Sequence, residues 1–260
     1  METAKKEPQK TWMNKVPEVT LVFWLIKMMS TTVGETAADY LDVNLCFGLT
    51  NTSILMGILL AVALFFQIRT NRYIPSLYWL SVVFISVFGT LITDNLTDHF
   101  EVPLVLSTIV FSVLLLITFA FWYAREKTLS IHHVDSIKRE LFYWTAVLFT
   151  FALGTAAGDW VAEGFEIGYA YAALLFGVLI AATALAWRYF KVNSVLCFWI
   201  AYILTRPFGA SCGDLLSQDA THGGLGLGVT GTSVLFLIAI IGLVIYLTIA
   251  ERKRAKGAIR

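Results

Sequence analysis

Charged residues are scarce in this sequence of 260 residues. Asp, Glu, Lys and Arg make up 14% of it, against about 25% in an average soluble protein. Hydrophobic residues reach 58%, and the mean hydropathy is +0.74. A soluble domain of this size has too little interior to bury so much apolar surface, so a soluble enzyme and a disordered chain are excluded. The composition predicts an integral membrane protein whose main partner is the lipid bilayer, with no nucleic-acid partner.

Cysteine and histidine are scarce as well. The three cysteines, Cys46, Cys197 and Cys212, are too few and too scattered for a disulfide framework or a CxxC site. Zinc and copper prefer thiolate and histidine ligands, and of the four histidines only His99 adjoins a candidate acidic site. The Gly-rich run 223–231 lacks the Lys-Ser/Thr ending of a phosphate-binding loop. We therefore expect no cofactor, apart from a divalent cation that would bind as substrate.

Long apolar stretches fill most of the chain. A helix that crosses a membrane needs about 20 predominantly apolar residues. The sequence predicts eight such helices, at about 18–41, 50–68, 76–98, 102–123, 141–163, 167–187, 194–216 and 226–249. The predicted organisation is a segment 1–17, a first membrane half 18–124, a linker 125–140, a second membrane half 141–250 and a basic tail 251–260.

The basic residues are distributed unevenly along these helices. Seventeen of the 19 Lys and Arg lie at the chain ends or in the loops after even-numbered helices, and the loops after odd-numbered helices hold none. The remaining two, Lys27 and Arg206, fall inside predicted helices. Because cytoplasmic loops of membrane proteins carry the excess of Lys and Arg, both termini are expected in the cytoplasm. The expected location is the inner (plasma) membrane of a bacterium.

An internal repeat marks the odd-numbered helices. Each of them ends near a Gly-x4-Asp motif, and the motifs are 55, 65 and 55 residues apart. The motif glycines are Gly34, Gly89, Gly154 and Gly209, and the motif aspartates are Asp39, Asp94, Asp159 and Asp214. The predicted even-numbered helices contain no charged residue. The pattern predicts four helical hairpins in two duplicated halves, all running in the same direction about an axis along the membrane normal.

Four hairpins that carry this motif, with phrases such as GETAADYL and GTAAGDW, resemble a family of bacterial membrane proteins. That family is built from the DUF347 repeat, a repeat of unknown function. The resemblance covers the chain from about residue 20 to residue 250. It implies an architecture of four hairpins and brings no established activity, so the chemistry must come from the residues.

Carboxylates inside a membrane need a compensating role, because each charged side chain costs about 2.5–3.5 kcal/mol at the centre of a membrane helix. A second acidic or polar residue follows each motif aspartate at a spacing of three or four, which places both on one helix face. These second residues are Asp42, Asp98, Glu163 and Gln218, and Glu35 adds to the first motif. We expect the odd-numbered helices inside, their aspartates converging on the axis, with Arg206 and Lys27 available to neutralise them.

The favoured hypothesis is a transporter or channel for a small cation, since carboxylate, carbonyl and hydroxyl oxygens suit Mg²⁺ and Mn²⁺. The predicted ion-binding set is Asp39, Asp94, Asp159, Asp214, Glu35, Asp98, Glu163 and Arg206, with the four motif aspartates as metal ligands. The main alternative is a structural or sensory membrane protein in which the motifs only pack helices together. A remote alternative is an intramembrane aspartyl hydrolase. The sequence leaves open the identity of the ion, the direction of transport, the coupling to protons and the oligomeric state.

Overall fold

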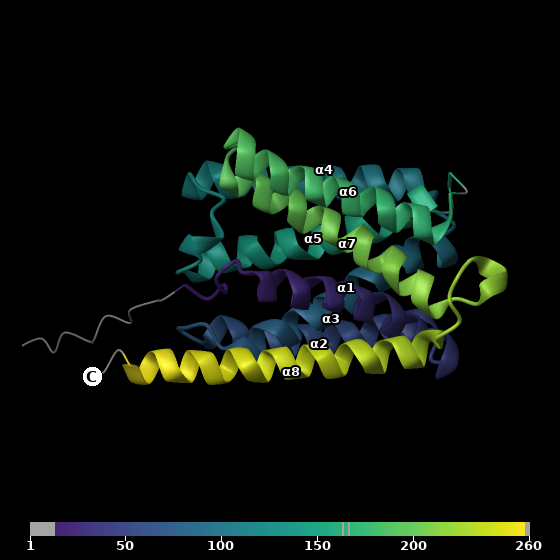
Figure 1. Ribbon diagram of the computed structural model, residues 1–260, viewed down its shortest axis with the longest axis horizontal. Coiled ribbons are helices and arrows are strands. Elements are labelled where there is room, and N and C mark those ends of the chain that lie inside the picture. The colour runs from purple at the N-terminus through teal and green to yellow at the C-terminus, as the bar shows by residue number, and fades with distance from the viewer. Residues whose placement is uncertain (1–13, 163, 166, 258–260) are drawn as a thin grey trace, which may run out of the picture.

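The computed structural model describes residues 14–162, 164–165 and 167–257, and their regular secondary structure is entirely helical. The eight long helices are α1 (Leu21–Asp39), α2 (Leu49–Arg69), α3 (Pro75–Asp94), α4 (Leu104–Glu126), α5 (Ile137–Ala162), α6 (Gly168–Phe190), α7 (Ser194–Ser217) and α8 (Gly228–Gly257). Two π-helices, η1 (Tyr40–Asn44) and η2 (Asn95–His99), continue α1 and α3, and two 3₁₀ turns, η3 (Ile131–His133) and η4 (Ala220–His222), lie in loops. The predicted all-α fold of eight helices is confirmed (Figure 1).

The odd-numbered helices form the interior of the bundle. Seven helices, α2 to α8, are long and apolar enough to cross a membrane. In the most apolar window of α3, α5 and α7, 56–61% of the residues are buried, whereas the fraction in α2, α4, α6 and α8 is only 11–22%. The even-numbered helices therefore present their apolar surface outward, as a lipid-facing layer does.

Helix α1 is the exception to this apolar pattern. It carries Lys27, Glu35 and several threonines, and these polar residues keep it out of the set of seven candidate spans. Its neighbours are α3, α7 and α8, and most of its residues between Lys27 and Ala38 are buried. Because α1 is surrounded by other helices, its polar side chains do not have to face lipid.

The four inner helices close a ring. Helix α1 packs against α3, α3 against α5, α5 against α7 and α7 against α1. Each outer helix packs mainly on the inner helix of the following repeat: α2 on α3, α4 on α5, α6 on α7 and α8 on α1. The last repeat thereby packs on the first, so the contacts that join one repeat to the next run all the way round the bundle.

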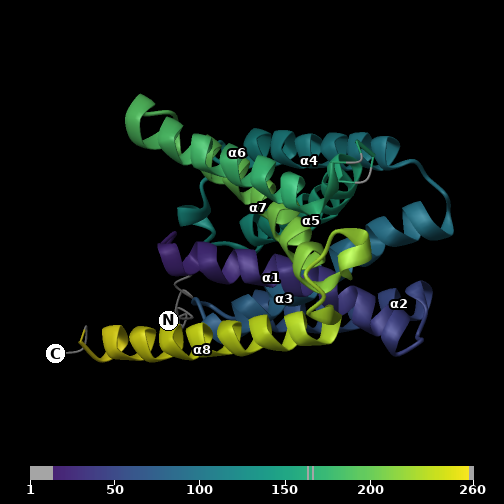
Figure 2. The ribbon, with the colours of Figure 1, turned by 45° about the vertical axis from the view of Figure 1, so that its right-hand side comes forward.

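Both ends of the helical chain lie at one end of the bundle. The start of α1 and the end of α8 lie at the left in both views (Figures 1 and 2), and we call this the terminal end. The Gly-x4-Asp motifs stand at or near the opposite ends of the inner helices, which we call the motif end. All four inner helices run from the terminal end to the motif end, so the repeats are parallel.

The interior is tightly filled at the terminal end. Five large aromatic side chains from three inner helices, each at most 4% exposed, pack together there: Tyr78, Trp79, Tyr143, Trp199 and Tyr202.

The segment before α1 adds a buried ion pair between Lys15 and Glu140. The Lys15 ammonium also donates to the Ile68 carbonyl oxygen (2.9 Å), and Gln67 Nε2 donates to Glu140 (3.2 Å). This pair therefore joins the segment before α1 to the end of α2 and the start of α5.

Candidate functional site at the bundle axis

The motif glycines are the points where neighbouring inner helices touch. Each glycine lies against the residue that stands three positions before the next motif glycine in the ring. A Cβ atom added at the glycine would come within 1.7–2.7 Å of that residue, which real Cβ atoms do not approach. The four contacts are Gly34 with Ser86, Gly89 with Phe151, Gly154 with Arg206, and Gly209 with Thr31. The same register at all four contacts gives the ring a pseudo-fourfold arrangement of parallel repeats.

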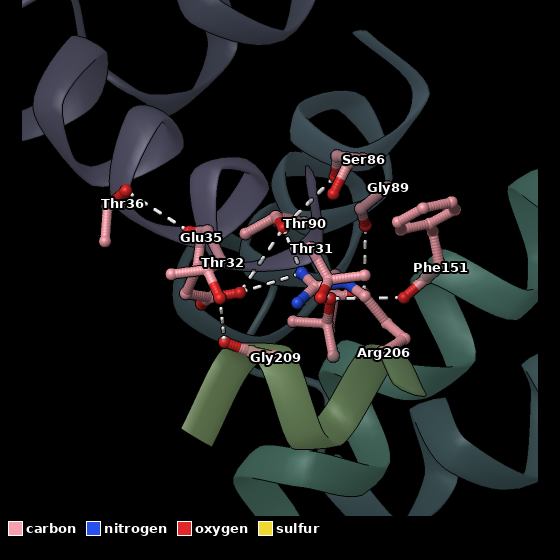
Figure 3. A network of polar contacts seen from close by, with 12 residues as sticks. Thr31, Thr32, Glu35, Thr36, Ser86, Gly89, Thr90, Phe151, Arg206 and Gly209 are labelled. Atoms are coloured by element: carbon pink, nitrogen blue, oxygen red, sulfur yellow. Dashed lines mark hydrogen bonds and ion pairs between the residues drawn. The ribbon is translucent and has the colours of Figure 1, made fainter. Parts of the chain in front are cut away.

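The residues that directly follow the motif glycines surround the guanidinium of Arg206. Arg206 Nη2 donates to Glu35 Oε2 (2.7 Å), to Thr155 Oγ1 (2.7 Å) and to Thr90 Oγ1. These three acceptors come from α1, α5 and α3, and Arg206 itself comes from α7. The small Ala210 follows the motif glycine of α7. Arg206 thus reaches across the centre of the ring and contacts all three other inner helices (Figure 3).

The Arg206–Glu35 ion pair is almost completely buried. The Arg206 side chain is 0% exposed and that of Glu35 10%. An ion pair taken out of water holds together only where geometry and further hydrogen bonds compensate for the lost hydration, and removing one partner leaves a buried charge that costs about 3–5 kcal/mol. The hydroxyl groups of Thr90 and Thr155 supply such further bonds. The pair therefore locks α1 to α7 on the axis of the bundle.

Lys27 lies further toward the terminal end of α1. It is 1% exposed, and its ammonium group lies 4.2 Å from the ring centre of Phe151 and 4.4 Å from that of Tyr202. Its hydrogen bond is a long one to Thr205 Oγ1 (3.4 Å). Attraction to the faces of the two rings partly replaces the water that the ammonium group has lost.

The motif aspartates gather at the motif end of the ring. Asp214 is buried, and Asp39, Asp94 and Asp159 are half-buried. Asp94 is close enough to Asp39, Asp159 and Glu35 for their charges to interact, and Asp214 interacts with the same three carboxylates and with Arg206. We call Asp39, Asp94, Asp159, Asp214 and Glu35 the acidic cluster. It unites residues from all four repeats that are far apart in the sequence.

The remaining members of the predicted ion-binding set lie further out. Asp98 is exposed on η2 and lies within electrostatic range of Asp39 and Asp94. Glu163 falls outside the described residues. Two motif aspartates, Asp39 and Asp94, stand where an α-helix passes into a π-helix, and such wider turns often occur at functional sites.

The acidic cluster does not form a metal coordination shell in this conformation. Among the described residues, no group of three or more His, Cys, Asp or Glu side chains is placed so that it could hold a metal ion. The carboxylates share one electrostatic environment without converging on one point. The assignment of Asp39, Asp94, Asp159 and Asp214 as metal ligands stays a prediction.

Buried hydroxyl groups also line the inner helices around this site, in addition to the residues predicted from the sequence. They belong to side chains that are at most 3% exposed: Ser30, Thr31, Thr32, Thr36, Ser86, Thr90, Thr93, Thr150, Thr155, Thr205 and Ser211. The sequence does contain a signal for the axial ones, because the residue after the motif glycine is polar in three of the four repeats. These hydroxyl groups make the interior of the inner ring polar at the level of the motifs.

Comparison with known protein families agrees with this repeating geometry. The family described as Repeat of Unknown Function (DUF347) matches the chain four times, over residues 22–73, 77–128, 142–193 and 197–253. The chain belongs to this family. The starts of the four DUF347 repeats are separated by the same 55, 65 and 55 residues as the motif glycines. No curated protein and no solved structure matches the chain.

Proposed function

We propose that this DUF347 protein is a membrane transporter for a small cation, and that the cation is divalent, of the Mg²⁺ and Mn²⁺ class. The observation that carries the proposal is the gathering of carboxylates from all four repeats at one end of the inner ring, next to a buried guanidinium on the axis. Carboxylate oxygens are the ligands that these cations prefer. Buried charges of one sign persist in a membrane protein where a counter-charge compensates them.

The contacts of Arg206 favour a carrier over an open channel. Its guanidinium lies on the axis of the ring and is hydrogen-bonded to Glu35. The aromatic side chains around Tyr78 and Tyr143 fill the interior at the terminal end. In the proposed cycle a cation enters the acidic cluster and replaces the guanidinium at Glu35. Arg206 neutralises Glu35 again once the cation has left, so the carboxylate is never buried without a counter-charge. Rocking of the two halves then exposes the cluster to the other side.

The proposed orientation places the terminal end in the cytoplasm. The basic residues at the ends of α2, α4 and α6 lie at the terminal end, as the positive-inside rule requires of cytoplasmic loops. The acidic cluster then faces the outside of a bacterial plasma membrane.

A structural role for the motifs is the second candidate, and two observations favour it. The motif glycines are helix contacts with no room for a side chain, and the carboxylates do not form a metal shell among the described residues. In that case the repeats serve to hold the bundle together, and the acidic cluster moves no ion.

Single aspartate-to-asparagine variants distinguish the two candidates. Purified protein is reconstituted into liposomes that contain a dye quenched by Mn²⁺, and the initial rate of uptake and the melting temperature are measured on the same preparation. The variants are Asp39→Asn, Asp94→Asn, Asp159→Asn and Asp214→Asn, with Asp219→Asn, an exposed residue near the same end, as the matched control.

A transporter should lose uptake roughly tenfold or more in the four motif variants, because one charge-assisted interaction contributes about 1.5–3 kcal/mol. Their melting temperatures should stay near that of the wild type, and Asp219→Asn should transport normally. Normal uptake in all four motif variants would end the cation-site proposal. A loss of melting temperature in a protein without measurable uptake would establish the structural role.

A further inference from the structure

Basic groups outnumber carboxylates in the middle of the inner ring, on the terminal side of the motif aspartates. Between the aromatic side chains of the terminal end and the motif aspartates lie two fully buried basic groups, Lys27 and Arg206, and one buried carboxylate, Glu35. Arg206 pairs with Glu35, and Lys27 takes part in none of the ion pairs found among the described residues. Lys27 and Arg206 are close enough for their charges to repel each other.

Most of the hydrogen-bond donors of these two basic groups have no acceptor in the part of the chain that the structure describes. All three acceptors of Arg206 bind the same nitrogen, Nη2, whereas Nε and Nη1 are buried and unpartnered. A guanidinium group has five N–H donors, three of which are on Nε and Nη1. The ammonium group of Lys27 has three donors, and its hydrogen bond is the long one to Thr205.

Both basic groups lie in the region around Phe151 of α5. Lys27 and Arg206 both approach the ring of Phe151, at 4.2 Å for the Lys27 ammonium and 5.9 Å for the Arg206 guanidinium carbon. Thr205, which accepts from Lys27, is the neighbour of Arg206 in the chain. Ser30, three residues after Lys27 on α1, has a buried hydroxyl group with no partner among the described residues. The region is therefore enclosed and rich in donors, and its two basic groups share a single carboxylate, Glu35.

We propose that this region is a binding site for a small monovalent anion of the chloride class. The Lys27 ammonium and the free Nε and Nη1 of Arg206 would hold the anion. A water molecule could accept some of these hydrogen bonds, but only an anion supplies the counter-charge that lets Lys27 and Arg206 both stay protonated away from solvent, where an unpaired charge is most costly. With Lys27 protonated, the formal charges of Lys27, Arg206 and Glu35 add up to +1, and one bound monovalent anion brings this sum to zero. The proposal rests on these contacts alone and does not depend on cation transport.

Thermal unfolding in solutions of different anions tests the site. The protein is purified in detergent without halide, and its melting temperature is followed as sodium chloride or sodium bromide replaces sodium gluconate at constant ionic strength. A ligand that binds only the folded state stabilises it by mass action, so a saturable rise of roughly 5–10 °C is expected at about a hundredfold excess over the Kd.

Two variants locate the effect. Lys27→Met removes the unpaired charge and should abolish the halide dependence, even if its own melting temperature changes. Lys138→Met removes an exposed lysine at the terminal end and should keep the dependence intact. Bromide should also give anomalous density between Lys27 and Arg206. A wild-type melting temperature that is equal in chloride and gluconate would overturn the proposal, and so would a halide dependence that persists unchanged in Lys27→Met.

Discussion

The contact between Gly34 and Ser86 makes a sharp test of the inner ring. A Cβ added at Gly34 would lie 1.9 Å from Ser86 Oγ, 2.7 Å from its Cβ and 3.0 Å from its backbone carbon. Rotation of the Ser86 side chain relieves only the first of these contacts, so Gly34→Ala must push α1 and α3 apart. Overpacking of this kind costs about 1–3 kcal/mol, and the better helix propensity of alanine returns about 0.5–1 kcal/mol.

The expected net loss in the free energy of unfolding is therefore about 1–2 kcal/mol, or roughly 2–8 °C in melting temperature for a chain of this size. Gly242→Ala is the matched control. It lies in the outer helix α8, where an added Cβ meets no atom within 4 Å, so it should be neutral or slightly stabilising. Both variants are compared with the wild type by thermal unfolding in the same detergent.

A double variant shows whether the steric contact is the cause. Ser86→Gly in the Gly34→Ala background moves the methyl-sized group from α3 to α1 and should recover most of the lost stability. The double-mutant cycle should give a coupling energy of at least about 1 kcal/mol, within the range seen for residues in contact. The ring of glycine contacts is refuted if Gly34→Ala has the same melting temperature as Gly242→Ala. It is also refuted if Ser86→Gly lowers the melting temperature of Gly34→Ala further instead of restoring it.

Three further predictions concern buried charge and topology. Arg206→Met should lower the free energy of unfolding by about 3–5 kcal/mol, because Glu35 stays buried without its cation. The double variant Arg206→Met with Glu35→Gln should recover much of this loss. Equal melting temperatures for the single and double variants would contradict the prediction. Lys15→Met should behave in the same way at the terminal end, with Glu140→Gln as the compensating change, and an unchanged melting temperature would show that the pair contributes nothing. Reporter enzymes fused in the loops after α1, α3, α5 and α7 should all report the outside of the membrane, and a cytoplasmic signal from any of them would break the proposed orientation.

The helices could be predicted from the sequence because membrane helices are marked by long apolar stretches. The stretch predicted at 194–216 is α7, Ser194–Ser217, and the one predicted at 76–98 is α3 together with η2. The spacing of the Gly-x4-Asp motifs likewise predicted four parallel repeats. The packing of each outer helix on the inner helix of the next repeat could not be predicted, because the apolar residues of an outer helix do not specify which inner helix they contact.

The candidate site was predictable only in part. The gathering of the motif aspartates at one end of the ring follows from repeat symmetry, since equivalent residues of four parallel repeats must lie at one level. The pairing of Arg206 with Glu35 could not be predicted from the sequence, because the two residues are 171 positions apart. They come together only when α7 packs against α1 and closes the ring. Thr90 and Thr155 were missed because a lone threonine in an apolar helix is common, and their role emerges only from their shared position after a motif glycine.

Uptake of Mn²⁺ by liposomes that contain the purified wild-type protein tests the central claim most directly. Dye-loaded vesicles with and without protein are compared under an inward Mn²⁺ gradient, and Mg²⁺ is then added as a competitor. Our account predicts uptake that depends on the protein, saturates with Mn²⁺ and falls roughly tenfold in Asp214→Asn. Equal rates in protein-containing and empty vesicles, for Mn²⁺ and for Mg²⁺, would contradict it.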